Sequence, residues 1–177
     1  VDFDHVFVKT GKADAKYSYK QAYGYFPGIV SIAGIIAYIK NRDGNTPVKF
    51  HQADTLSRAF KLLHSYGLHI GIFRADCDSY SEDIIRTVDG NCRIFYIRAI
   101  HSASMYSRIQ DIREWRRVEI GTQETEVASV MSTQFMEDSR YRIVVQRTKE
   151  KDCTPDLFGD RYTYRCIITN DWDSEEK

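Results

Sequence analysis

Three aspartates stand in or at the end of apolar segments, where their carboxylates could do chemistry together. Asp2 and Asp4 alternate with apolar residues in the opening VDFDHV, and Asp76 closes the apolar segment HIGIFRAD. Alternate side chains of an extended strand share a face, so Asp2 and Asp4 are expected side by side. A buried carboxylate is costly unless it is paired, hydrogen-bonded or bound to a metal. Carboxylates from two neighbouring strands could hold a hard divalent cation, so the pair Asp2 and Asp4 together with Asp76 offers a candidate metal site.

The same acids also have a purely structural interpretation. An aspartate at a strand end commonly caps a helix or forms a turn. Asp2 is expected to be a supporting acid at the strand edge, and Arg74 an ion-pair partner on the strand face opposite to Asp76. Spacing alone leaves the cap and the metal site both open.

Two groups of basic residues lie close to aromatic ones and could contact DNA. The first group is a run of lysines interleaved with Tyr17 and Tyr19: Lys9, Lys12, Lys16 and Lys20. The second group surrounds Trp115: Arg113, Arg116 and Arg117. Cationic side chains neutralise phosphates and aromatic rings stack on bases. A solvated charged surface explains each group equally well.

The composition sets limits on function. The 177 residues suffice for one sizeable domain, or for one domain with an insertion. Lys plus Arg number 25 and so do Asp plus Glu, so any contact with nucleic acid must be local. No apolar run approaches the roughly 20 residues of a membrane helix, and no membrane partner is expected. Four widely spaced cysteines without a CxxC pair indicate reduced thiols in an intracellular protein.

Strands alternate with single helices over residues 1–100. After an opening strand, the segment KTGKADAKYSYKQAYGYFPG is expected to be a loop. In IVSIAGIIAYIKNRDGNTPVKF, two apolar runs separated by NRDGNTP predict a hairpin with Asp-Gly at its turn. The segments HIGIFRAD and CRIFYIRAI are expected to be strands, with the helix SYSEDIIRTVDG between them. This order predicts an α/β fold, a mixed sheet with flanking helices.

An amphipathic helix is expected in QADTLSRAFKLLHSYGL. Its N-cap would be Asp54 or Thr55, and it would stop at Gly67. The apolar residues at helical spacing are Leu56, Ala59, Phe60 and Leu63. This pattern predicts one buried helix face.

The character changes after residue 100. A possible helix, SASMYSRIQDIREW, precedes the strand-like segments RRVEI, TEVASV, YRIVVQR and YTYRCIIT. Residues 101–177 are therefore expected to form a β-rich subdomain. The chain opens inside a strand at Val1 and closes on the acidic NDWDSEEK, which reads as a helix start or a frayed end. We interpret the chain as an internal fragment of a larger protein.

Several of these segments together resemble a known family. VDFDHV, GYFPG, the hairpin, QADTLSRAF and IFRADCDSYS are similar to the catalytic core of bacterial insertion-sequence transposases of the DDE type. The resemblance covers residues 1–100 closely and continues more loosely to YTYRCIITND, which matches the strand before the final catalytic helix.

The resemblance implies a fold, an activity and partners. Residues 1–100 would be an RNase H-like core, and residues 101–177 an insertion subdomain leading toward the last catalytic helix. Three acids would bind two Mg²⁺ ions, with Mn²⁺ as a substitute, for DNA cleavage and strand transfer. Asp4 would be the first acid and Asp76 the second. The partner would be DNA, both as transposon ends and as target. The whole protein would be a cytoplasmic homodimer associated with the nucleoid. The insertion, which contains Arg113, Arg116 and Arg117, would contact the transposon ends.

The sequence departs from this family in three places. His5 and Val6 replace a small hydroxylated pair after the first acid, and Asp78 stands at a glycine-like position after the second. No residue matches the third acid, a Glu, because Glu175 and Glu176 lack its Tyr and Arg neighbours. Weak metal binding without efficient strand transfer is expected. A degenerate remnant that only binds DNA or self-associates, or an unrelated metal-dependent nuclease, are the alternatives.

Overall fold

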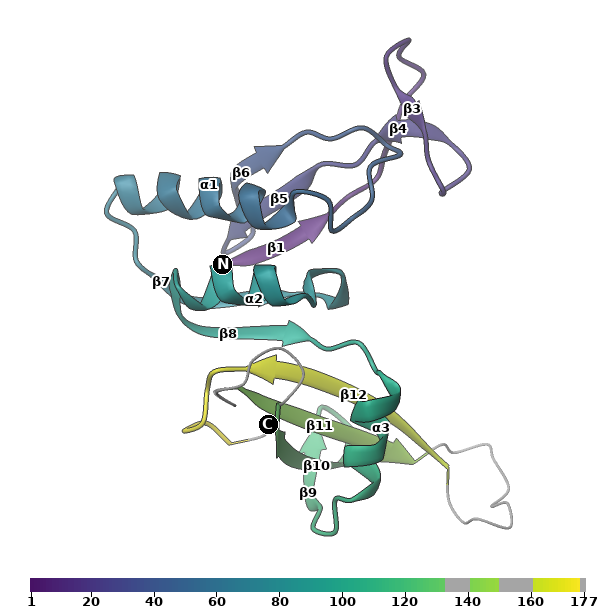
Figure 1. The fold of residues 1–177 in the computed structure, drawn as a ribbon, viewed down its shortest axis with the longest axis vertical. Coiled ribbons are helices and arrows are strands. Elements are labelled where there is room, and N and C mark those ends of the chain that lie inside the picture. Colours follow the sequence, from purple (N-terminus) through teal and green to yellow (C-terminus); the bar gives the residue numbers. More distant parts are fainter. Residues whose placement is uncertain (133–140, 150–160, 176–177) are drawn as a thin grey trace. The chain divides into compact units, whose positions relative to one another are not determined.

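The chain is a mixed α/β protein that divides into two compact units, Val1–Tyr96 and Ile97–Lys177. A computed structural model describes residues 1–132, 141–149 and 161–175. These ranges contain nine strands of the main sheet, a small three-stranded sheet and three α-helices (Figure 1). Within them, no helix has the length and apolar character needed to cross a membrane.

The first unit is built on a mixed sheet with the strand order β6-β5-β1-β7-β8. Its strands are β1 Asp2–His5, β5 Gly28–Ile32, β6 Ile35–Lys40, β7 Ile70–Ala75 and β8 Cys92–Arg98. β1 is central, antiparallel to β5 on one side and parallel to β7 on the other. Two helices follow in the connections after β6 and β7: α1 Gln52–Ser65 and α2 Glu82–Asp89. The predicted alternation of strands and helices is thereby confirmed.

The core of this unit lies on one face of the sheet. Phe3, Val30 and Phe73 point to that face, and each is at most 3% exposed. α1 packs there, with the Phe60 ring 5.7 Å from the Phe73 ring in an edge-to-face contact. The four apolar residues predicted for the helix face are all buried, so that prediction is confirmed.

The start of α1 differs from the prediction. The N-cap is His51, in a left-handed conformation with φ 53° and without a capping side chain. Asp54 instead lies in the first turn, where its carboxylate pairs with Arg58 at 3.1 Å. The end agrees with the sequence, because Gly67 follows the helix with φ 73°.

The predicted hairpin has its turn in a different place. β5 and β6 both lie inside the apolar run, and Ala33 and Gly34 connect them with φ values of 50° and 81°. Two consecutive positive φ values give a turn whose twist matches that of the flanking strands. The segment NRDGNTP lies after β6, and the second run, VKF, forms no strand. β6 is also largely exposed, although most of its residues are apolar.

The predicted loop after β1 contains a second sheet. It has the order β2-β4-β3, with β2 Val8–Lys9, β3 Lys16–Tyr17 and β4 Tyr23–Tyr25, all antiparallel. Gly44 lies against this sheet, and its N–H donates to the Gly24 carbonyl at 3.0 Å. The strands were not predicted because each has only two or three residues, which is too short to show an apolar periodicity.

The second unit contains an antiparallel sheet in the order β12-β11-β10-β9, together with α3 Ala103–Gln110. The strands are β9 Arg116–Ile120, β10 Gln123–Met131, β11 Arg142–Lys149 and β12 Tyr162–Thr169. Ser102 caps α3, since its hydroxyl accepts from the Met105 N–H at 3.2 Å. Every predicted strand of this half is present. Residues 170–175 contain no helix, and Glu176 lies outside the described residues.

Candidate functional site

Asp4 and Asp76 are brought together by the pairing of β1 with β7. Asp2 lies opposite Arg74 and Phe3 opposite Ala75, so the next row of this parallel pair is Asp4 beside Asp76. The backbone at Asp76 is still extended, with φ −79° and ψ −173°. Because neighbouring strands lie about 4.8 Å apart, the two aspartates are adjacent on the sheet. Residues 72 positions apart in the sequence thus occupy one row.

Both aspartates belong to the sheet face opposite α1. Phe3 points into the core, so Asp2 and Asp4 point the other way, as do Arg74 and Asp76 on β7. In the row before the two candidate ligands, the Arg74 Nε lies 2.6 Å from Asp2 Oδ1. The hydrogen bond from Arg74 lowers the pKa of Asp2. Arg74 is therefore the ion-pair partner that the sequence predicts, but the prediction that it lies on the opposite face from Asp76 is wrong.

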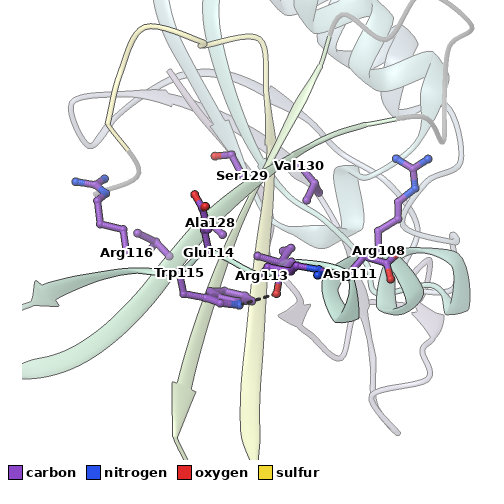
Figure 2. A pocket seen from close by; sticks show the side chains of 11 residues that line it. Arg108, Asp111, Arg113, Glu114, Trp115, Arg116, Ala128, Ser129 and Val130 are labelled. Carbon is purple, nitrogen blue, oxygen red and sulfur yellow. Dashed lines mark hydrogen bonds between the residues drawn. The ribbon is translucent and has the colours of Figure 1, made fainter.

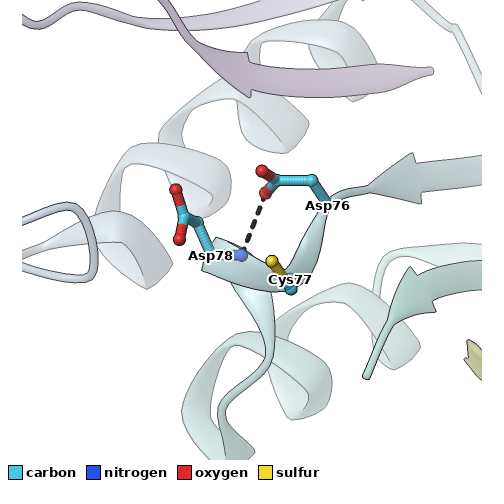
Figure 3. Close-up of side chains that lie close together, drawn as sticks. All are labelled: Asp76, Cys77 and Asp78. Carbon is cyan, nitrogen blue, oxygen red and sulfur yellow. Dashed lines mark hydrogen bonds between the residues drawn. The ribbon is translucent and has the colours of Figure 1, made fainter. Parts of the chain in front are cut away.

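The loop after β7 carries two further metal-ligating side chains. Asp76 Oδ1 accepts from the Asp78 N–H at 3.0 Å and so caps the short 3₁₀ helix Cys77–Ser79 (Figure 3). One ligand atom each of Asp76, Cys77 and Asp78 lies within 4.8 Å of the others. Asp76 is thus a cap, as the structural interpretation predicts, and also has neighbouring ligand atoms.

Polar contacts from the first residue of α1 and from the turn before it hold this loop. Gln52 and Ser79 are each 1% exposed, and Gln52 Nε2 donates to Ser79 Oγ at 2.6 Å. Lys49 Nζ donates to the Tyr80 carbonyl at 2.8 Å. Sequence reasoning did not identify these positioning residues. The sequence signal that could have identified Gln52 is a polar residue at the start of an otherwise apolar helix face.

His5 has a structural role on the opposite face from Asp4. Its Nε2 lies 2.5 Å from the Arg42 guanidinium, and its ring packs against Phe3 and Phe26 at 4.9 and 5.6 Å. Burial, with a further contribution from Arg42, lowers the pKa of His5 to about 4. A neutral His5 therefore accepts from Arg42, which also donates to the carbonyls of Val48 and Pro47. His5 thus anchors the segment after β6.

The residues present fit a hard divalent cation in part. Carboxylate oxygens are the ligands that Mg²⁺ and Mn²⁺ prefer, and Asp4, Asp76 and Asp78 supply them. Asp4 Oδ1 accepts from the His5 N–H at 2.7 Å, which fixes the orientation of that carboxylate. The Cys77 sulfur is a softer donor that suits other metals better. The fit rests on the aspartates alone.

The four lysines proposed to contact DNA lie in or beside the small sheet. Lys9 belongs to β2 and Lys16 to β3, while Lys12 and Lys20 lie in the connecting turns. All four are exposed. The Lys20 ammonium lies 4.9 Å from the centre of the Tyr19 ring. The sheet therefore gathers these residues in one small region.

The three arginines proposed to contact DNA are distributed differently. Arg113 and Arg116 line an open hollow of about 720 Å³ beside β10, which Asp111 and Glu114 also line (Figure 2). Arg116 also pairs with Glu175 at 3.4 Å. The hollow therefore combines both charge signs, and Glu175, the weak candidate for a third acid, has a basic partner.

Arg117 points away from that hollow. It follows Arg116 on β9, and consecutive side chains of a strand point to opposite faces. Its guanidinium lies 3.9 Å from Glu124 and 3.8 Å from Glu126. The three arginines therefore do not form one basic patch.

Arg147 on β11 is a partly buried cation that sequence reasoning missed. Its guanidinium lies 3.9 Å from the centre of the Trp115 ring and 4.4 Å from that of Tyr162. Its Nε also pairs with Glu126 at 2.6 Å. Trp115 thus stacks on Arg147, and this contact explains the position of its ring beside the sheet without a DNA base.

Comparison with known proteins adds no further assignment, because neither protein-family models nor curated proteins give a match to this chain. Functional interpretation therefore rests on the residues and their arrangement.

Proposed function

We propose that the chain is a central part of the catalytic domain of a DDE-type transposase. Its first unit would be an RNase H-like core, and its second unit the β-rich insertion. The whole protein would cut and join DNA with Mg²⁺. The alternating strands and helices of the first unit, with a central β1 between an antiparallel and a parallel neighbour, support this interpretation.

The observation that carries the proposal is the row formed by Asp4 and Asp76. The two acids come from distant segments, yet the pairing of β1 with β7 makes them neighbours on the face away from α1. The ion pair with Arg74 accounts for Asp2 in the neighbouring row. Two adjacent carboxylates repel each other unless a proton or cation lies between them.

Asp4 and Asp76 would hold the cation, which when bound would polarise a DNA phosphodiester and lower the pKa of a bound water. The His5 N–H orients the Asp4 carboxylate, and the Asp78 N–H orients that of Asp76. Gln52 and Lys49 keep the loop of Asp76 against α1. The chain's own residues thus fix the positions of two acids before any ligand binds.

A catalytically inactive remnant that only binds DNA or self-associates is the second candidate. Glu175, an acid near the end of the chain, pairs with Arg116 of its own unit. The partly buried contact of His5 with Arg42 also gives residue 5 a structural role. Both observations favour a chain in which structural roles have replaced catalytic ones.

Metal titration tests the proposal. Mn²⁺ binding, followed by electron paramagnetic resonance, should give a weak site with a dissociation constant of about 10⁻⁴ to 10⁻³ M. Asp4→Asn and Asp76→Asn should each weaken binding at least tenfold, or about 1.4 kcal/mol, because each removes one anionic ligand.

Asp54→Asn is the matched control, since Asp54 is an aspartate on α1 whose partner is Arg58. Equal Mn²⁺ binding by the wild type, both ligand variants and the control would refute the acid pair as a metal site. Loss of Mn²⁺ binding in both ligand variants, with unchanged binding in the control, would support the acid pair as the metal site.

A further inference from the structure

An open hollow of about 770 Å³ lies on the small sheet of the first unit. Larger polar and aromatic side chains that line it are Lys9, Lys12, Tyr17, Gln21 and Tyr23. The remaining lining is small: Thr10, Gly11, Ala13, Ala15 and Ala22. The hollow thus combines cations, aromatic rings and open space.

Two tyrosines form the aromatic part. Tyr17 on β3 lies directly opposite Tyr23 on β4, so both rings share one face of the sheet. The ring centres are 5.1 Å apart and the planes cross at 71°. The residues are 55% and 58% exposed, which is far more than packing alone requires of a tyrosine. Edge-to-face packing orients each ring while leaving ring surface for a planar ligand.

The region is strongly basic in a chain that has no net charge. Residues 8–25 contain four lysines and a single acid, Asp14. The Tyr25 hydroxyl donates to Asp14 at 2.6 Å, and this bond lowers the pKa of the carboxyl. Asp14 does not line the hollow. The lysines that line the hollow therefore make it suitable for binding a polyanion.

The hollow is formed by ordered backbone. The Thr10 N–H donates to the Tyr23 carbonyl at 3.0 Å, and the Ser18 N–H to the Ala22 carbonyl at 2.9 Å. Gly44 supports the sheet through its bond to Gly24. A ligand would meet positioned side chains without first having to order a loop, which favours binding.

We propose that this hollow binds an unpaired segment of a DNA strand. A base stacks on Tyr17 or Tyr23, and Lys9 and Lys12 contact the flanking phosphates. An unpaired strand is favoured over a duplex because stacking on tyrosine needs a base whose face is not covered by its neighbours. The inference rests on the DNA substrate of the proposed function and adds the strand state that this surface selects.

Binding of fluorescently labelled oligothymidine and of a mixed-sequence duplex of the same length, measured by anisotropy in EDTA, tests the proposal. The wild type should bind the single strand more tightly than the duplex. Tyr17→Ala combined with Tyr23→Ala should weaken single-strand binding about tenfold or more, because stacking of one base alone accounts for about that factor. Lys9→Ala combined with Lys12→Ala should reduce the slope of log K against log salt by about 1.4, since each phosphate contact adds about 0.7.

Two further variants separate a local effect from loss of folding. Gly11→Trp fills the hollow from a position where an added Cβ meets nothing within 4 Å, and it should also weaken binding. Tyr66→Ala with Lys61→Ala changes an exposed tyrosine and lysine at the end of α1 and should bind as the wild type does.

The outcomes are distinguishable from those of the metal titration. Single-strand binding that the tyrosine variant retains, or equal affinity for duplex, overturns the unpaired-strand inference and leaves the acid pair untouched. An absence of DNA binding by the wild type overturns it as well, whatever the Mn²⁺ result. Loss of Mn²⁺ binding in Asp4→Asn with unchanged single-strand binding agrees with two separate functions for the acid pair and the hollow.

Discussion

Replacing Gly44 by alanine tests whether the segment after β6 supports the small sheet. An added Cβ would lie 2.8 Å from the Lys16 carbonyl oxygen and closer still to the Gly24 oxygen. Both are backbone atoms held by strand pairing, so they cannot rotate away. The Gly44 N–H also donates to Gly24 at 3.0 Å, and a shift of the segment would lengthen that bond.

The cost follows from these contacts. Overpacking costs about 1 to 3 kcal/mol, and one weakened hydrogen bond about 1 kcal/mol. The loss of glycine freedom in the unfolded chain offsets about 0.4 to 1 kcal/mol. Gly44→Ala should therefore destabilise the protein by about 1 to 3 kcal/mol, measured by urea denaturation followed by circular dichroism.

Gly11→Ala is the matched control from the same sheet region. Nothing lies within 4 Å of its added Cβ, so the substitution should be neutral or stabilising by up to about 1 kcal/mol. Hydrogen exchange at the Gly44 and Thr10 amides should accelerate only in Gly44→Ala. Equal stability of the two variants would refute the argument that Gly44 is needed for close approach.

Three other predictions concern titration, packing and reactivity. Stability should fall as pH falls from 6.5 toward 4, because unfolded His5 takes up a proton that the folded chain binds only near pH 4. Allowing for partial exposure, the fall is about 1 to 2 kcal/mol, and pH-dependent urea titration of His5→Gln should lack it. Arg147→Ala should cost about 1 to 3 kcal/mol, because the guanidinium touches two aromatic rings and a carboxylate, and Arg147→Lys should recover only part of that in thermal denaturation. Burial raises the pKa of the Cys92 thiol to about 12 and that of Cys166 to about 11, so partly exposed Cys77 should be alkylated before these two at about pH 8 in a mass-spectrometric time course. A flat pH profile, an unaffected Arg147→Lys, or equal labelling of Cys77, Cys92 and Cys166 would contradict the respective argument.

Local sequence patterns were sufficient to predict a helix or strand whose own residues show a clear apolar pattern. The periodicity of α1 identified its buried face, and the apolar runs identified β7 and β8. The hairpin turn was misplaced because Asp-Gly in NRDGNTP is a stronger local signal than Ala33-Gly34, although the latter has the φ values of the turn. The small sheet escaped detection because strands of two or three residues show no period, and pairing partners alone stabilise them.

The sequence by itself determined the kinds of groups available and the segments that carry them. Asp2, Asp4 and Asp76 could be selected as candidates because an acid in or beside an apolar strand is unusual, and the family resemblance singled out Asp4 and Asp76 among them. Strand register decided which of these groups meet. It joined Arg74 to Asp2, set Asp4 beside Asp76, and sent Arg116 and Arg117 to opposite faces. Register depends on residues far apart in the chain and on the burial of one sheet face, and a shift of one residue would exchange every side chain between the faces.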